Sequence, residues 1–361
     1  MALFIGIVGL PNVGKSTLFN ALAGGHAAAS NYPFCTVDPN VGMVAVPDQR
    51  LEKLKAALEP QSCTPTAIEF VDIAGLVRGA SQGEGLGNRF LSQVRQADAL
   101  VHVLRCFADP QISHVEGGID PLRDREVVEA ELMLADLETI EKALSRLDKV
   151  VRTDPHSPQR LEFEVLQKVE QALQRGRARW SSELAPEELG AIGTHNLLTG
   201  KPVLYIGNVG EKAEGQEQVE QLARAVGREQ LLIISARLEA ELAQLEPAER
   251  KEFQAELGVE ETGMERLILA GYRLLDLITF YTIANDKLQA WQLPRGATAL
   301  SAAGRIHTDM ERGFIRAEVA SAPEVIGAGS LVRLRDEGRL RTEGRDYLVQ
   351  DGDVVHFLFR A

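Results

Sequence analysis

The sequence contains a phosphate-binding pattern near its start. Residues 9–16 read GLPNVGKS, which fits the spacing GxxxxGK[ST], and they lie between an apolar segment at 4–8 and a helix-forming segment at 17–22. Glycines allow backbone N–H groups to turn toward an anion, and the N-terminus of the following helix adds partial positive charge. The pattern predicts a nucleoside-triphosphate site.

The side chains of this loop have distinct expected roles. Lys15 is expected to neutralise the β and γ phosphates and to assist hydrolysis, and the Ser16 hydroxyl is expected to bind Mg²⁺. The predicted nucleotide contacts of the loop are Asn12, Val13, Gly14, Lys15, Ser16 and Thr17.

Further positions are typical of GTPase-type P-loop proteins. Asp72 and Gly75 form a DxxG segment at the end of an apolar run, where the carboxylate can hold Mg²⁺ and the Gly75 N–H can bond the γ-phosphate. Thr36 precedes that run, and its hydroxyl can complete the metal's ligands. Leu76 stands where small GTPases have a water-orienting glutamine, so hydrolysis requires another group.

The base-reading segment differs from that of GTPases. GTPases use Asn-Lys-x-Asp, in which the Asp accepts hydrogen bonds from guanine, whereas this chain reads NVGE at the matching place. We expect Asn208 to bond N7 and the 6-amino group of adenine, with Val209 and Glu211 beside it. The loss of the guanine clamp favours adenine over guanine. Ser235 and Ala236 are expected to form the loop that backs the ring.

Length and composition exclude several classes of protein. The 361 residues suffice for two or three domains, and 45% hydrophobic and 25% charged residues are ordinary for a soluble globular protein. The sequence has no run of about eighteen apolar residues, so no membrane span is expected. Three cysteines without metal-ligand spacing indicate a reduced, cytoplasmic protein.

The charge is negative overall but unevenly distributed. A net charge of −13 argues against a protein coated in basic surface for nucleic acid, and no DNA partner is expected. Residues 287–345 nevertheless hold ten Lys/Arg against seven Asp/Glu. Two interpretations stay open for this segment: a solvated surface of mixed charge, or a locally basic module that meets RNA or an acidic partner.

Apolar runs that read as strands alternate with helical segments in two parts of the chain. They lie at 4–8, 68–73 and 99–105, and again at 201–206 and 230–235. This alternation predicts a doubly wound α/β sheet.

The region between these parts, and the end of the chain, follow other patterns. Apolar residues spaced four and three apart from Met133 to Val151 predict a helix with a heptad seam. A break at 153–158 and a second amphipathic run from 161 complete an inserted helical hairpin. After an expected helix at 263–277, the last eighty residues predict a small α+β domain with a mixed or antiparallel sheet.

Four motifs together resemble the YchF/Obg-like ATPase family. They are GLPNVGKS at 9–16, NYPFCT at 31–36, DIAGLV at 72–77 and NVGE at 208–211. FIRA at 314–317 and DGDVV at 351–355 are similar to that family's TGS domain. The resemblance implies a GTPase-type nucleotide-binding domain in two parts, 1–127 and 200–277, with a coiled-coil insertion at 128–199 and a TGS domain at 278–361.

The resemblance also implies an activity and its residues. It implies an ATPase of the Obg-related class of translation factors, associated with ribosomes or ribosomal RNA and with stress responses. Leu76 matches that class's hydrophobic substitution for the catalytic glutamine. His114 is the implied catalytic residue, since an imidazole can position or activate water. Asn12 matches the position that binds K⁺ in potassium-stimulated members, so K⁺ is implied beside Mg²⁺.

The leading hypothesis is a cytoplasmic, ATP-hydrolysing switch whose nucleotide state is transmitted to the ribosome. An adaptor that binds ribosomes or RNA with negligible turnover stays open, and the missing glutamine favours it. A GTPase of the Obg class is the other alternative. A small-molecule P-loop kinase fits the DxxG and NxxE segments poorly.

Overall fold

The structure of the protein is a computed structural model. It describes residues 3–25, 40–73, 75, 86–115, 117–154, 156–210, 215–257 and 261–360. Three expected site residues, Thr36, Leu76 and Glu211, lie outside the described residues. The described chain divides into two compact units, the first from residues 3–25, 40–42 and 70–263, and the second from residues 43–69 and 264–360.

A six-stranded sheet carries the P-loop, with strand order β2-β4-β1-β5-β6-β7. Strands β1, β5, β6 and β7 pair in parallel, as the alternating pattern predicts. All seven residues of β5 are buried, which is typical of a strand covered on both faces. The strands are β1 (Phe4–Val8), β2 (Val41–Ala45), β4 (Ala67–Asp72), β5 (Ala99–Arg105), β6 (Val203–Asn208) and β7 (Leu231–Ile234).

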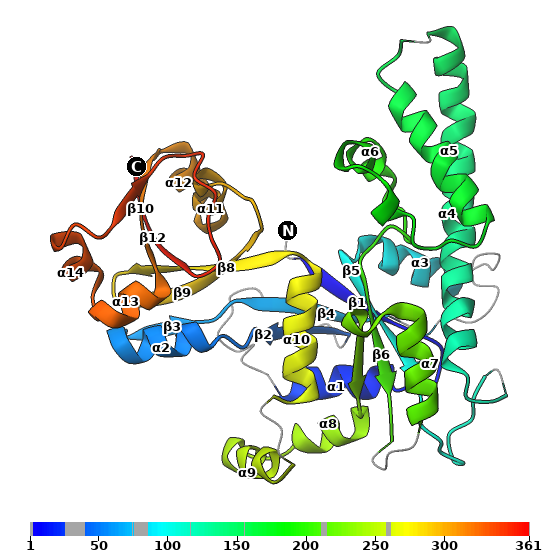
Figure 1. Ribbon diagram of the computed structural model, residues 1–361, viewed down its shortest axis with the longest axis horizontal. Coiled ribbons are helices and arrows are strands. Elements are labelled where there is room, and N and C mark those ends of the chain that lie inside the picture. The colour runs from blue at the N-terminus through cyan, green and yellow to red at the C-terminus, as the bar shows by residue number, and fades with distance from the viewer. Residues whose placement is uncertain are drawn as a thin grey trace. The chain divides into compact units, whose positions relative to one another are not determined.

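Helices follow these strands and make the first unit an α/β structure (Figure 1). The P-loop leads into α1, so the expected strand–loop–helix arrangement is confirmed. The helices are α1 (Lys15–Gly25), α3 (Leu86–Gln96), α7 (Gln216–Val226), η4 (Arg228–Gln230), α8 (Ala236–Leu242) and α9 (Pro247–Leu257).

The predicted helical hairpin is confirmed as an insertion between β5 and β6. Its long helix α4 (Pro121–Thr153) packs against α5 (Arg160–Gln174), as Figure 1 shows. Ile140 and Leu147 of the predicted seam are fully buried in the hairpin's own core. The helix begins twelve residues before the seam, because Asp120 caps it by accepting a hydrogen bond from the Arg123 N–H at 3.1 Å. The insertion continues with η2 (Ser181–Glu183), α6 (Pro186–Ile192) and η3 (Gly193–His195).

The second unit contains a mixed six-stranded sheet with order β11-β10-β12-β8-β9-β3. Strand β10 pairs antiparallel with β11 and β12, and β8 with β9, whereas β12–β8 and β3–β9 are parallel. This confirms the predicted α+β character. Its strands are β3 (Ser62–Thr64), β8 (Leu277–Ala284), β9 (Lys287–Pro294), β10 (Phe314–Ser321), β11 (Arg341–Glu343) and β12 (Asp353–Phe359). Its helices are α2 (Gln49–Leu58), α10 (Gly263–Leu274), α11 (Ala299–Ile306), α12 (Thr308–Arg312), α13 (Ala322–Ala328) and α14 (Leu331–Asp336).

Residues 43–69 belong to this second unit, although the sequence placed them in a first domain of residues 1–127. The apolar face of α2 presents Leu51 and Leu54 to a core that includes Tyr281 and Val325. Strand β3 pairs with β9 at the edge of the mixed sheet. The C-terminal unit is therefore larger than the expected segment 278–361, because it recruits a strand and a helix from the early chain.

Within the described ranges, none of the helices combines the length and apolarity that crossing a membrane requires.

Candidate nucleotide site

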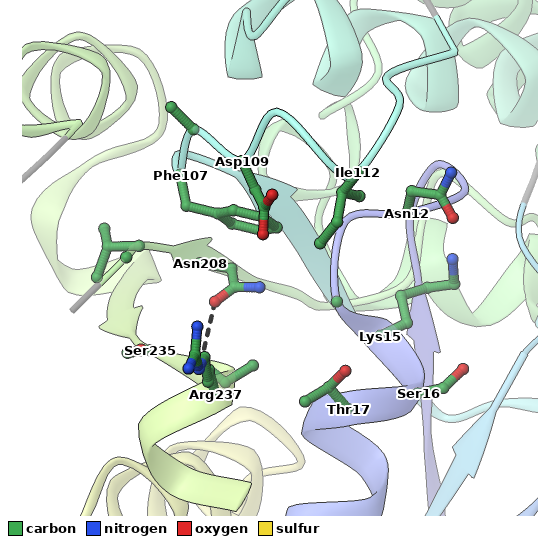
Figure 2. A pocket seen from close by; sticks show the side chains of 15 residues that line it. Asn12, Lys15, Ser16, Thr17, Phe107, Asp109, Ile112, Asn208, Ser235 and Arg237 are labelled. Carbon is green, nitrogen blue, oxygen red and sulfur yellow. Dashed lines mark hydrogen bonds between the residues drawn. The ribbon is translucent and has the colours of Figure 1, made fainter.

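The P-loop opens onto a cavity of about 700 Å³ in the first unit (Figure 2). The segments that line it follow β1, β5, β6 and β7, at the edge where open α/β sheets bind ligands. The structure thus brings the P-loop and the base-reading segments to one cavity. The lining residues that the sequence predicted are Asn12, Gly14, Lys15, Ser16, Thr17, Asn208, Val209, Ser235 and Ala236.

The backbone of the P-loop requires glycine at position 14. Gly14 has φ +97°, a conformation that side chains with a Cβ rarely adopt. A Cβ there would also lie 2.2 Å from the Asn208 Nδ2. Gly14 therefore allows the loop to close against the strand that carries the base-reading segment.

Lys15 is held at the floor of the loop. It is only 7% exposed, and its Nζ donates a hydrogen bond to the Leu10 carbonyl at 2.8 Å. Burial lowers the pKa of Lys15 to about 8, although the nearby Asp72 carboxylate acts to raise it. An ammonium group with one carbonyl partner in a dry site is suited to receive a phosphate.

Ser16 and Asp72 lie together as the metal prediction requires. The Ser16 Oγ donates to Asp72 Oδ2 at 2.7 Å, and Asp72 Oδ1 is buried without a hydrogen-bond partner among the described residues. A hydroxyl and a carboxylate with an unsatisfied oxygen fit Mg²⁺, which prefers oxygen ligands and keeps several waters. The described chain holds no cluster of three His, Cys, Asp or Glu residues that could bind a metal without a phosphate.

Gly75 approaches the same place from the DxxG segment. A Cβ on Gly75 would lie 3.1 Å from the Lys15 Nζ, so the backbone at this point lies close to the phosphate end of the loop. Gly75 does not line the cavity, and neither does Val13, which is 1% exposed.

Asn208 joins two backbone segments rather than pointing freely into the cavity. Its Nδ2 donates to the Val13 carbonyl at 2.8 Å, and its Oδ1 accepts from the Ala236 N–H at 3.0 Å. The side chain is 4% exposed. Each amide atom thus makes one bond to the protein, which leaves a second N–H and a second oxygen lone pair for a ligand, and the expected contacts of Asn208 with N7 and the 6-amino group stay a prediction. Ser235 caps α8 by accepting from the Leu238 N–H at 3.4 Å.

The sequence did not point to a further wall of the cavity, which follows β5. Phe107, Ala108, Asp109 and Ile112 line the cavity there, and Arg237 lines it from the first turn of α8. Figure 2 shows Phe107 and Asp109 on the same side of the cavity as Asn208. Their position after the carboxyl end of a parallel strand was the one signal available in the sequence.

His114 lies at the end of this wall but not in the cavity lining. Its ring is 6% exposed, and Nε2 is 2.8 Å from Oδ2 of the fully buried Asp124, in the first turn of α4. The neighbouring Ser113 carbonyl accepts from the Asn12 Nδ2 at 3.3 Å, which connects the wall to the P-loop. The expected catalytic residue thus lies next to a segment that bonds the P-loop, and its imidazole contacts Asp124 of α4.

Two family models match the chain. One, described as a 50S ribosome-binding GTPase, matches residues 4–143, and the other, YchF-GTPase_C, described as a protein of unknown function, matches residues 277–360. The first match covers β1, β2, β4 and β5 of the P-loop sheet, and the second covers β8 to β12 of the mixed sheet.

Curated relatives match along the whole chain. The ribosome-binding ATPase YchF of Bacillus subtilis is 46% identical over 367 residues, covering 100% of both chains. The protein of the same name from Haemophilus ducreyi is 47% identical over 99% of both chains. The structure of the Schizosaccharomyces pombe YchF GTPase superposes with a TM-score of 0.88 at 34% identity, covering 99% of this chain and 97% of that one. On this similarity in sequence and structure, the chain belongs to the YchF family of GTPase-type P-loop proteins.

Proposed function

We propose that this protein binds and hydrolyses ATP with Mg²⁺ and that its nucleotide state is communicated to the ribosome. The observation that supports this proposal is the single cavity that joins the P-loop to the segments after β5, β6 and β7. Its phosphate end and its nucleoside end are formed by different residues.

The phosphate end consists of groups that favour a triphosphate. Lys15 donates to the β and γ phosphates, and the N-terminus of α1 adds partial positive charge. Ser16 and Asp72 hold Mg²⁺, together with Thr36 from outside the described residues. Bound Mg²⁺ supplies charge neutralisation at the transferring phosphate.

The nucleoside end favours adenine because it lacks a guanine clamp. Asn208 holds the P-loop against the Ala236 segment with one N–H and one lone pair, and its second N–H and second lone pair contact the base. Val209 and Glu211 replace the lysine and aspartate of GTPases, and together with the ring of Phe107 on the wall after β5 they contribute to the discrimination between bases.

Hydrolysis needs another group to position water, because Leu76 stands where GTPases have a glutamine. We assign that role to His114, whose imidazole must leave Asp124 to reach an attacking water. Asn12 binds K⁺ through its amide oxygen, while its Nδ2 is held by the Ser113 carbonyl. The expected consequence is slow turnover until a partner releases His114.

The ribosome is the proposed partner because the curated relatives carry that function in their names. The cytoplasm is the matching location. A ribosome-binding adaptor with negligible turnover is the second candidate, and the contact that holds His114 on α4 favours it.

The deciding experiment combines cosedimentation with ribosomes and multiple-turnover hydrolysis, under ATP, ADP and no nucleotide. Ribosome binding that depends on ATP, with turnover above the uncatalysed rate, supports the switch. Binding without turnover supports the adaptor, and tighter binding of GTP than ATP contradicts the adenine assignment.

Two variants test the catalytic assignments. His114→Ala should keep ATP affinity and lose most turnover; full turnover would remove His114 from the mechanism. For Asn12, wild-type turnover should be higher in K⁺ than in Na⁺ at equal ionic strength, and equal turnover would exclude a K⁺ site.

A further inference from the structure

Arg105 ends β5 and lies behind the wall that residues 107–113 form. It is 2% exposed, although arginine is among the residues least often fully buried. Its guanidinium donates to four backbone carbonyls: Nε to Phe107 at 3.1 Å, Nη1 to Ser113 at 3.3 Å, and Nη2 to Asp109 at 3.3 Å and Ile112 at 3.1 Å.

These four bonds fix the path of the loop. A guanidinium presents its donors in a rigid planar fork, so one side chain can tie peptides that are six residues apart. The Arg105 Cζ also lies 4.5 Å from the centroid of the Phe107 ring, within range of a cation–π contact. Arg105 therefore positions both the backbone of the wall and its aromatic side chain.

The wall belongs to the nucleoside end of the cavity. Arg105 and Asn208 are direct partners in the register of β5 and β6, so the wall rises beside the base-reading segment. Phe107 lies near Asn208 in Figure 2, whereas Lys15 and Ser16 mark the far, phosphate end.

We propose that Arg105 is a positioning residue for the nucleoside. It holds Phe107 and Ile112 as a preformed wall for the base and ribose, and it acts through the loop without touching the nucleotide. The proposal rests on the proposed function, because it assumes that a nucleoside triphosphate occupies this cavity.

Arg105→Lys tests the proposal by keeping the charge and removing the fork. One ammonium cannot serve four spread carbonyls, so we expect the Kd for ATP to rise about tenfold or more. The Kd for inorganic tripolyphosphate, which needs only the P-loop, should stay within about twofold. An unchanged ATP affinity, or an equal loss for both ligands, would overturn the proposal.

The matched control is Arg95→Lys, which alters an arginine of the same unit whose partner is the Thr139 hydroxyl, outside the cavity. It should leave both affinities unchanged. If wild-type protein binds tripolyphosphate but not ATP, the proposed function fails, whereas tight ATP binding by Arg105→Lys refutes only the role of Arg105.

Hydrogen exchange on the wild-type chain keeps the proposal testable if the variant does not fold. ATP should slow amide exchange in residues 107–113 more than saturating tripolyphosphate does, because only ATP has a nucleoside to press on the wall. Equal protection by the two ligands would contradict the proposal.

Discussion

Acid should destabilise the first unit through His102, a residue at the centre of the P-loop sheet. His102 is 2% exposed, and its Nε2 has no hydrogen-bond partner among the described residues. Burial, with a smaller contribution from the positive charges of Arg125 and Lys15, lowers the pKa of His102 to about 3. Its ring contacts that of Tyr205 on β6, with centroids 5.6 Å apart. The imidazole is therefore neutral in the folded protein at any pH that the cell meets.

The sign and size of the effect follow from linkage. In the unfolded chain the pKa of this histidine is 6.5. Below that pH the unfolded chain binds a proton that the folded chain does not bind, so the unfolding free energy decreases as the pH is lowered, down to about pH 3. Between pH 8 and pH 5 this single histidine should cost about 2 kcal/mol of unfolding free energy, and by pH 4 about 3 kcal/mol. His102→Leu has no proton to bind and should lose this part of the pH dependence.

Urea unfolding at several pH values measures the difference. Trp180 is buried in the hairpin core of the first unit, so a Trp291→Phe background makes fluorescence report this unit alone. The matched control is His356→Gln, an exposed histidine on β12, which should follow the wild type. Parallel pH profiles for His102→Leu and the wild type would refute the reasoning.

Two further predictions concern contacts outside the cavity. Asp124→Asn weakens the bond that keeps His114 on α4, so basal ATP turnover should rise up to about tenfold at unchanged ATP affinity; an unchanged or lower rate would contradict this reading. Arg50→Met removes a paired contact to Asp351 and one to Asp48, and both contacts are partly exposed to solvent. The substitution should lower the unfolding free energy of the second unit by about 1 kcal/mol. This corresponds to a decrease of a few degrees in Tm, measured by Trp291 fluorescence. Molar salt should reduce the difference in Tm between the variant and the wild type. An unchanged Tm in low salt would show that the ion pairs of Arg50 do not stabilise the unit.

Patterns that rest on local spacing were predictable from the sequence. The strands at 4–8 and 99–105 have the predicted bounds, since apolar runs before a glycine-rich loop or a break have few alternative structures. The start of α4 was missed because its first turns carry charged side chains, including the buried Asp124, that a search for apolar periodicity passes over. The sequence did not predict that α2 belongs to the second unit, because the apolar face of an amphipathic helix does not indicate which sheet packs against Leu51 and Leu54.

Part of the candidate site could likewise be predicted from the sequence, and part could not. The P-loop could be recognised because backbone geometry requires its glycines, and the charge of the phosphates requires its lysine, at fixed spacing. The wall after β5 could not, because Arg105 acts on carbonyl oxygens, which every residue has and no sequence pattern marks. Side chains that recognise a ligand are visible in a sequence, whereas those that shape the backbone around it emerge only with the fold.

The hydrogen bonds of Asn208 give this residue a structural role in addition to the base reading that the sequence predicts. Because one amide links the Val13 carbonyl to the Ala236 N–H, any nucleotide that displaced it would also loosen the P-loop from the segment after β7. The second N–H and the second oxygen lone pair of the amide can contact a purine while these two bonds persist. The proposed function adds the Phe107 wall and the substitutions in the NVGE segment to the groups that select the base. In the proposed function, this asparagine both preserves the architecture of the site and contacts the base, and the neighbouring substitutions at Val209 and Glu211 favour adenine.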